Sequence, residues 1–235
     1  MPTQDFDIDR LAAYLHLSPQ KVARLADRGK LPGRKVGGQW RFSRAEIHHW
    51  LEERIGLADE EELVSVEGVL RRDRGPEEAE NVVLADLILP EAIAIPLLAR
   101  TRNAVIQAMV DLAAGTGFLW DPQKMVEAVR QREEMQSTAM DSGVALLHPR
   151  RPMAAVLGQP LMAFGRTNSG VPFGGGFSNL TDMFFLICSV DDRGHLQTLA
   201  RLARVLGSPD VLSALRQAEN AGAVQRLLAE AEAGL

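Results

Sequence analysis

The sequence predicts two domains, a small unit of short helices with a β-hairpin and a larger α/β domain. Over residues 1–55, apolar positions repeat at helical spacing and a Gly-Gly turn separates two alternating runs. Beyond residue 83, long helical stripes interleave with short apolar runs, which is typical of α/β architecture. A stretch rich in acidic residues lies between them. The length of 235 residues fits two ordinary domains.

The composition is that of a protein with a substantial core, with 46% hydrophobic and 24% charged residues. The net charge of −5 does not indicate a nucleic-acid partner, but residues 1–54 have an excess of Lys and Arg. A single cysteine, Cys188, excludes an internal disulfide and lies in an apolar run, so we expect a buried thiol. We see no secretion signal and no run long enough to span a bilayer, and therefore expect a cytoplasmic protein with no membrane partner.

Two short helices begin the chain. Apolar residues repeat at helical spacing over residues 8–15. Ser18 and Pro19 then mark a new helix start, with serine as the N-cap and proline at the first helical position. In this second helix we expect Val22 and Leu25 to face inward.

A hairpin and a third helix follow. Residues 34–36 and 39–42 alternate around Gly37-Gly38, which predicts a two-residue β-turn. The sequence Ser-Arg-Ala-Glu at 43–46 is a capping box that opens a helix. Its buried face is expected to contain Ile47, Trp50 and Leu51.

This order of elements, with KLPGRKVGGQWRFSRAEIHHWL at residues 30–51, resembles the excisionase-type, MerR-like winged helix-turn-helix family. The resemblance implies binding to double-stranded DNA, with the second helix in the major groove and the hairpin wing on the backbone, so residues 1–55 are expected to be the DNA-binding domain. The alternative is that its charges merely solvate a small surface. On the family's pattern, Gln20, Lys21 and Arg24 face bases or phosphates, and Arg28 lies near the DNA backbone. Salt-dependent phosphate contacts are expected from Lys30, Arg34, Lys35 and Arg41.

Residues 56–82 have the mixed charge and Gly-Pro composition of a boundary, and we expect an acidic linker there. Leu63, Val66 and Leu70 would form one face of a short amphipathic helix that serves as a homodimer contact. A solvated connector fits the same residues equally well.

Helical stripes and apolar runs alternate through residues 83–235. Helices are expected after the N-cap Thr101 and from Asp121-Pro122. A four-residue apolar run at 144–147 is predicted to be a buried strand. Further strands are expected at 161–164 and 183–190, and further helices over 196–206, from Ser208-Pro209 and around 224–228.

The residue with the most distinctive chemistry is His148. It directly follows the predicted strand at 144–147, so its ring should emerge at a strand end, where α/β proteins build their sites. A neutral imidazole is a competent nucleophile. Phosphoryl transfer to it needs mainly positioning and donors around the phosphoryl oxygens. Arg132 offers a planar guanidinium fork, and Ser137 and Thr138 offer hydroxyls.

The run REEMQSTAMDSGVALLH at 132–148 resembles the enzyme IIA domains of the fructose, mannitol and nitrogen-related branch of the phosphotransferase system. Arg132-Glu133, Ser137-Thr138, Gly143 and His148 fall on the family's positions, and HLQTLARLARVL places its second histidine at His195. Over residues 83–235 the resemblance implies an α/β domain with a mixed sheet flanked by helices. It further implies phosphorylation of His148 by the histidine phosphocarrier protein, with His195 helping to hold the phosphoryl group, and no cofactor.

The chain also departs from the family pattern. Leu147 precedes His148 where the family has proline, Ala139 follows Thr138 where it has glycine, and Asp141 adds a carboxylate. These departures leave open a ligand-sensing pocket that transfers no phosphate, or a structural His148. For His195, the separate alternative is that it simply caps its helix.

The function expected from the sequence is therefore a DNA-binding regulator whose enzyme IIA-like domain is phosphorylated on His148. It would be an enzyme only in the sense of a phosphohistidine carrier. The alternatives are a carrier that passes phosphate to an enzyme IIB without gene regulation, and a ligand-sensing regulator with a degenerate IIA domain. The glycines at 174–176 lack a phosphate-binding-loop pattern, and His48-His49 lack metal-ligand spacing.

Overall fold

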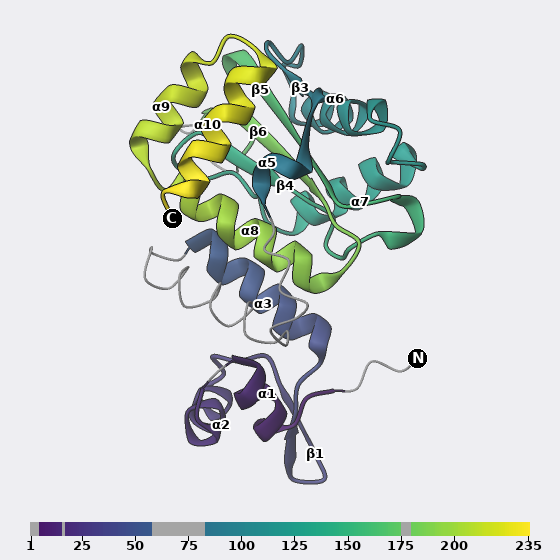
Figure 1. Ribbon diagram of the computed structural model, residues 1–235. Coiled ribbons are helices and arrows are strands. Elements are labelled where there is room, and N and C mark those ends of the chain that lie inside the picture. The colour runs from purple at the N-terminus through teal and green to yellow at the C-terminus, as the bar shows by residue number, and fades with distance from the viewer. Residues whose placement is uncertain (1–4, 16, 58–82, 175–179) are drawn as a thin grey trace. The chain divides into compact units, whose positions relative to one another are not determined.

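The computed structural model describes residues 5–15, 17–57, 83–174 and 180–235 (Figure 1). The chain divides into two units, residues 1–81 and 82–235. We call the described residues 5–57 the N-terminal unit and those from 83 onward the C-terminal unit. The expected linker helix at Leu63, Val66 and Leu70 lies outside the described residues, as do Gly175 and Gly176.

The N-terminal unit contains the predicted order of helix, helix, hairpin and helix. Ser18 Oγ accepts a hydrogen bond from the Lys21 amide at 3.3 Å, which caps the second helix. In the hairpin, Gly37 and Gly38 have φ values of 57° and 78°, which suits the two-residue turn. The elements are α1 (Ile8–Leu15), α2 (Pro19–Asp27), β1 (Arg34–Val36), β2 (Gln39–Arg41) and α3 (Arg44–Leu57).

A small core holds these elements together. Phe6 and Phe42 exchange two backbone hydrogen bonds, of 2.8 and 2.9 Å, so the segment before α1 is fastened to the base of the hairpin. The inward face of α2 differs slightly from the expected one, because Val22 and Ala26 are buried whereas Leu25 is half-buried. Trp50 is also half-buried, since its indole N–H donates to the Lys30 carbonyl at 2.8 Å and so stays near the surface.

The C-terminal unit is built on a four-stranded mixed sheet, which confirms the predicted class. The strand order is β3-β5-β6-β4. The pairs β3–β5 and β4–β6 are parallel, and β5–β6 is antiparallel. The elements are α5 (Leu84–Leu87), β3 (Ile88–Ala94), α6 (Arg102–Gly115), α7 (Pro122–Met135), β4 (Val144–Leu147), the short 3-10 helix Ala154–Val156, β5 (Leu161–Pro172), β6 (Leu180–Cys188), α8 (Asp192–Leu206), α9 (Pro209–Gln217) and α10 (Ala221–Ala233).

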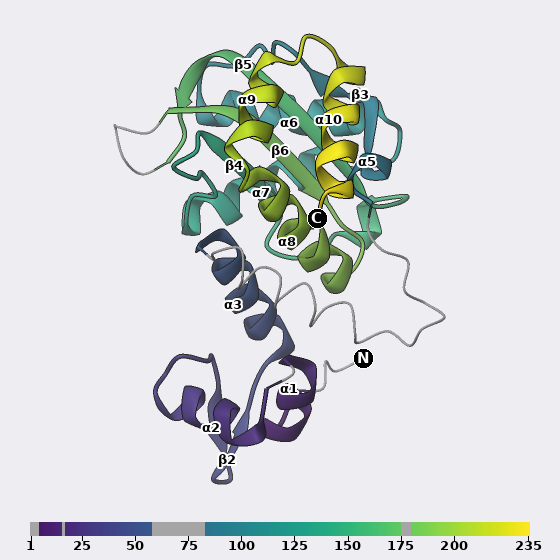
Figure 2. The same cartoon turned by 60° about the vertical axis from the view of Figure 1, so that its left-hand side comes forward.

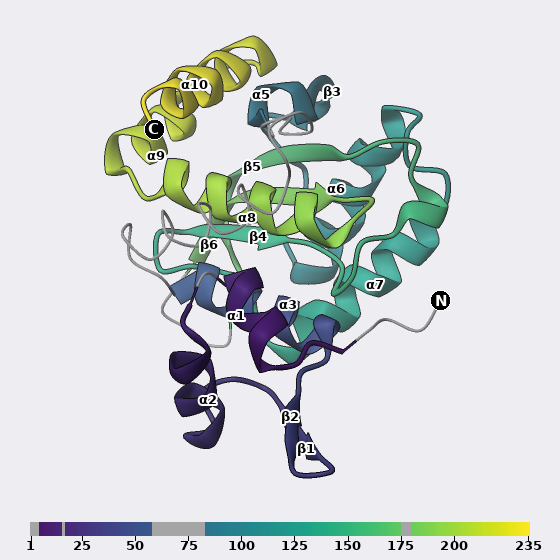
Figure 3. The same cartoon turned by 60° about the horizontal axis from the view of Figure 1, so that its bottom comes forward.

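Helices cover both faces of this sheet. In Figure 2, α9 and α10 lie in front of the strands and α6 lies behind them, and Figure 3 shows α7 and α10 at opposite sides of the unit. Ala145 and Leu147 of β4 pack into the core shared with α6 and α7, so the alternate residues Val144 and Leu146 point to the other face. All four are buried, as expected for a strand covered on both sides.

Three strands differ from the prediction. β5 spans Leu161–Pro172 rather than 161–164, because its antiparallel pairing with β6 continues as far as Pro172. β3 was not predicted from the sequence. β6 spans Leu180–Cys188 rather than 183–190, because the chain turns after Cys188 toward Asp191, the N-cap of α8. Ser189 therefore lies just beyond the end of the strand, next to the first turn of α8.

The last helix fastens the beginning of the C-terminal unit. Glu232 of α10 is buried, and its Oε2 accepts a hydrogen bond from the Leu84 amide at 2.8 Å. Its other oxygen accepts from Arg201 of α8. The side chain thus joins α5, α8 and α10. Among the described helices, none is both long enough and apolar enough to cross a bilayer.

Candidate functional site

The segment before β4 runs back along that strand. Ala139 forms an antiparallel bridge with Ala145, and the amide of Leu146 donates to the Thr138 carbonyl at 3.4 Å. If this register continues, Gln136 lies opposite His148. The sequence between α7 and His148 therefore folds as a hairpin, which brings the end of α7 to the imidazole.

His148 is only 3% exposed and its ring is oriented by a backbone group. Nδ1 lies 2.7 Å from the Leu146 carbonyl oxygen. A carbonyl can only accept, so Nδ1 must carry the proton of this bond. In the neutral ring, Nε2 then holds the lone pair and is the ring atom that can act as a nucleophile.

His195 lies in the first turn of α8, where Asp191 caps the helix through the amides of Arg193 and Gly194 at 3.0 and 2.8 Å. Because β4 and β6 are parallel, their carboxyl ends meet at one edge of the sheet, and the two histidines meet there. Their ring centroids are 5.1 Å apart, with an interplanar angle of 58°. The structure thus brings together the two histidines that the sequence singled out.

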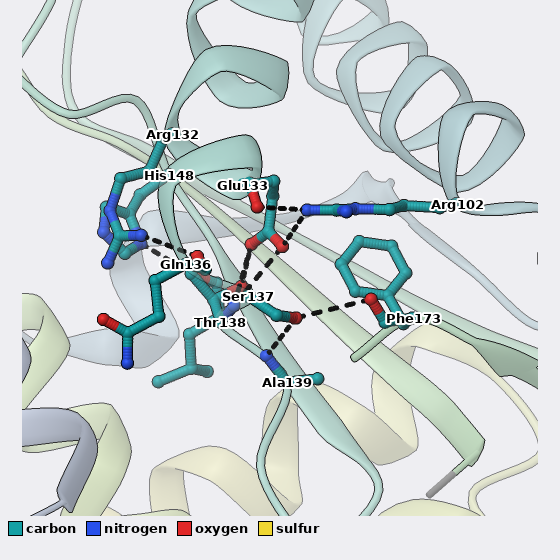
Figure 4. Close-up of polar contacts among 10 residues, drawn as sticks. Arg102, Arg132, Glu133, Gln136, Ser137, Thr138, Ala139, His148 and Phe173 are labelled. Carbon is teal, nitrogen blue, oxygen red and sulfur yellow. Dashed lines mark hydrogen bonds and ion pairs between the residues drawn. The ribbon is translucent and has the colours of Figure 1, made fainter. Parts of the chain in front are cut away.

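Arg132 lies in the last turn of α7 and is buried. One terminal nitrogen donates to the Gln136 carbonyl at 2.9 Å, at the His148 end of the hairpin (Figure 4). Its buried Nε has no hydrogen-bond partner among the described residues. A guanidinium with an N–H group that makes no hydrogen bond within the described residues suits an anionic ligand. The role of Arg132 as a phosphoryl-binding residue stays a prediction.

Ser137 and Thr138 shape the loop between α7 and the hairpin. The Ser137 hydroxyl accepts from the Ala139 amide at 3.2 Å and donates to the Phe173 carbonyl at 3.4 Å. The Thr138 hydroxyl donates to the Glu133 carboxylate, which also accepts from the Thr138 amide at 3.1 and 3.3 Å. In this structure both hydroxyls hold backbone in place, and their expected contact with a phosphoryl group stays a prediction.

Glu133 is the centre of a buried charge network that the sequence did not reveal. Its side chain is 1% exposed, and Arg102 from the start of α6 approaches its Oε2 at 3.1 Å. Arg102 also donates to the Glu133 carbonyl and stacks over the Phe173 ring, 5.5 Å from the centroid (Figure 4). A buried carboxylate needs such pairing, and here the pairing fixes the loop that contains Thr138.

Asp141 lies at the turn of the hairpin, at the opposite end of β4 from His148. The four residues of β4 lie between Gly143 and His148, so five residue-to-residue steps of extended chain separate them, about 16 Å at ~3.3 Å per step. Asp141 lines a polar pocket of about 350 Å³ with Asp182 and Arg216. Arg216 is paired with Asp182 at 2.8 and 3.0 Å, which raises the pKa of the guanidinium. The Asp141 carboxylate is therefore remote from the imidazole.

In the N-terminal unit, the predicted DNA contacts from α2 are exposed, namely Gln20, Lys21 and Arg24, together with Arg28 at its C-cap. Lys30, Arg34 and Lys35 are exposed as well, and Arg41 is half-buried. Two hairpin cations lie against carboxylates. Arg34 pairs with Asp5 at 2.9 Å and Lys35 with Asp27 at 3.6 Å. The outer face of α2 is therefore the stronger candidate for anion contact.

Each of the two units matches the model of a known protein family. Residues 86–231 match the family model described as phosphoenolpyruvate-dependent sugar phosphotransferase system, EIIA 2. The chain belongs to this EIIA 2 family. Residues 6–55 match a helix-turn-helix domain model, so a helix-turn-helix domain is fused to the EIIA 2 domain.

Two curated relatives of this chain have different names. A nitrogen regulatory protein of Bradyrhizobium diazoefficiens is 32% identical over 151 residues, which are 62% of this chain and 94% of that protein. The fructose-specific EIIABC component of the phosphotransferase system of Bacillus subtilis is 28% identical over 143 residues, or 60% of this chain. The chain spans only 22% of that larger protein.

Solved structures confirm the fold of the EIIA 2 domain. A complex of enzyme IIAMTL and phosphorylated enzyme IIBMTL from Escherichia coli matches with a TM-score of 0.53 at 20% identity. The match covers 61% of this chain and 99% of the solved one. At this identity the likeness concerns the fold alone.

Proposed function

We propose that the protein is a DNA-binding regulator whose EIIA 2 domain accepts a phosphoryl group on Nε2 of His148 from the histidine phosphocarrier protein. The observation that supports it most is the hydrogen bond from Nδ1 of His148 to the Leu146 carbonyl, which leaves the lone pair on Nε2. The neighbouring ring of His195 supports it further. Because both proposed partners are cytoplasmic, the protein is proposed to act in the cytoplasm.

In the proposed transfer, the Nε2 lone pair of neutral His148 attacks the phosphorus of the donor's phosphohistidine. A new N–P bond forms while the donor's N–P bond breaks, and that electron pair returns to the donor's imidazole. The proton on Nδ1 stays in place, so the His148 ring becomes positively charged. A charged donor makes a stronger hydrogen bond, and the Leu146 carbonyl therefore stabilises the product.

Arg132 is the proposed partner of the phosphoryl oxygens. Phosphoryl transfer depends on positioning and on positive groups rather than on covalent chemistry by the protein. Arg132 is held at the His148 end of the hairpin through Gln136. The Arg102–Glu133–Thr138 network keeps that loop in place. The remote position of Asp141 removes one argument for a pocket unable to hold phosphate.

The proposed regulatory role follows from the presence of a helix-turn-helix domain and an EIIA 2 domain in one chain. A phosphoryl group adds about −1.5 to −2 charges at the edge of the sheet. The exposed basic residues of α2 would contact DNA phosphates, which makes affinity salt-dependent. The name of the Bradyrhizobium relative, a nitrogen regulatory protein, fits a regulatory rather than a transport role. An EIIA carrier that delivers phosphate to an enzyme IIB is the alternative.

The phosphorylation is tested by incubating the full chain with phosphoenolpyruvate, enzyme I and the phosphocarrier, and measuring acid-labile phosphate. We expect one label per chain, which His148→Ala abolishes. His49→Ala, a histidine of the N-terminal unit, serves as the control and should keep the label. An unlabelled wild type, or a label that survives His148→Ala, would refute the proposal. Label that moves on to an added enzyme IIB would favour the carrier alternative.

A further inference from the structure

Ser189 contacts both segments that bear the site histidines. Its hydroxyl oxygen lies 3.1 Å from Nδ1 of His195. Its backbone carbonyl accepts a hydrogen bond from the Met153 amide at 3.0 Å, and Met153 lies on the chain that leaves β4 after His148. One residue at the end of β6 therefore links the loop after His148 to the ring of His195.

This contact lies in the interior of the unit. Ser189 is 4% exposed, His195 is 1% exposed and His148 is 3% exposed. Water competes little for a hydrogen bond at such a site, and the bond is stronger than it would be at the surface. The partner of each ring nitrogen therefore decides which nitrogen holds the proton.

The two rings face chemically different partners. Nδ1 of His148 meets a carbonyl, which can only accept, so that nitrogen must be N–H. Nδ1 of His195 meets a hydroxyl, which can also donate. Adjacent imidazoles can thus be held in opposite tautomers, one with its lone pair on Nε2 and the other with its hydrogen there.

We propose that Ser189 is a positioning residue that donates its hydroxyl hydrogen to Nδ1 of His195 and so keeps the proton of the neutral ring on Nε2. His195 then offers an N–H donor to a phosphoryl oxygen on His148. In the other tautomer Nε2 would present a lone pair, which repels an anion. This role rests on the proposed phosphorylation of His148.

The tautomer can be measured without any phosphoryl donor. In the unphosphorylated full chain with 15N-labelled histidine at neutral pH, nuclear magnetic resonance should show hydrogen on Nε2 of His195. Ser189→Ala should shift this ring toward a mixture of tautomers. Thr198→Val is the matched control, because it removes a different buried hydroxyl, which lies on α8 and is bonded to the Gly194 carbonyl at 2.8 Å. Hydrogen on Nδ1 of His195 in the wild type would overturn the proposal.

The rate of labelling provides the second readout. We expect Ser189→Ala to slow phosphorylation of His148 about three- to tenfold, the kinetic equivalent of one hydrogen bond, with KM for the donor unchanged. Ser189→Thr retains the hydroxyl and should restore the rate, whereas Thr198→Val should not alter it. If Ser189→Ala were phosphorylated at the wild-type rate, the proposed role of Ser189 would be overturned, but not the phosphorylation of His148. A wild type that takes no label would instead overturn the proposed function, while the tautomer measurement still tests the hydrogen bond even if Ser189→Ala fails to fold.

Discussion

At the scale of single residues, the surroundings of a side chain determine its chemical reactivity. Cys188 ends β6 in a run of buried residues, and burial raises the pKa of its thiol to about 12. The thiolate is the reactive form, and it is scarce when the pKa lies far above the ambient pH. The cysteine next to Ser189 is therefore an inert core residue.

We predict that Cys188 in the native chain at pH 8 reacts with a disulfide reagent at least about a hundredfold more slowly than the same thiol in the chain unfolded by guanidinium chloride. The reason is both burial and the raised pKa, since nearly all of the thiol stays protonated. The release of reagent chromophore measures the rate. Prompt stoichiometric reaction of the folded chain would contradict it.

The positions of the two site histidines were predictable from local sequence order, whereas their chemistry stays a prediction. Arg132, His148 and His195 were singled out from spacing and resemblance, and the two histidines do meet. Arg102 and Ser189 were missed because each acts across the fold. Arg102 reaches Glu133 over 31 positions, and Ser189 acts on His195 only because β6 ends one residue before it. Sequence spacing contains no sign of either contact.

At the scale of elements, the hairpin that ends at His148 depends on its turn. Gly143 has a φ of 84°, a left-handed conformation that glycine adopts without strain. A Cβ there would lie 2.9 Å from Arg216 Nη2 and 3.1 Å from Asp182 Oδ1. The turn therefore packs against an ion pair between α9 and β6.

We predict that Gly143→Ala lowers the free energy of unfolding by about 1–3 kcal/mol, from backbone strain together with the displaced ion pair. Urea denaturation measures it. Gly117→Ala is the matched control, because Gly117 has a φ of 79° but nothing lies within 4 Å of the place that an added Cβ would occupy. It should lose less stability, and equal losses would show that the Arg216–Asp182 contact contributes nothing.

Elements with clear periodicity and caps were predicted well, whereas β3 was missed entirely. The helices opened by Ser18, Thr101 and Asp121 begin at the expected caps. β3 was missed because Pro90 and Glu91 interrupt its apolar pattern, and both are exposed. β3 is an edge strand, where a proline is tolerated because one side needs no ladder hydrogen bond.

At the scale of the whole molecule, the two units divide the proposed tasks. The N-terminal unit presents cations on the outer face of α2, and the C-terminal unit encloses its histidines at the edge of the sheet. A net charge of −5 for the chain hides this division. Electrostatic attraction to DNA should therefore depend on few residues.

We predict that Arg24→Ala weakens binding to duplex DNA of any sequence and reduces the slope of log affinity against log salt by about 1, the value for one lost phosphate contact. Fluorescence anisotropy over a salt series measures it. Arg226→Ala, an exposed arginine of the C-terminal unit, should leave the slope unchanged. Neither substitution should affect the labelling of His148. Equal effects of the two substitutions would contradict a specific role for α2.

The hydrogen bond between Glu232 and the Leu84 amide has a consequence for how such a domain combines with others. It holds the first and last helices of the C-terminal unit side by side. Domains whose ends lie together can be joined to, or inserted between, other modules without rearrangement of their cores. In this chain, the domain follows a helix-turn-helix domain. In the Bacillus subtilis EIIABC component, the matching region is 22% of a much longer protein. The domain's fold makes it a portable module.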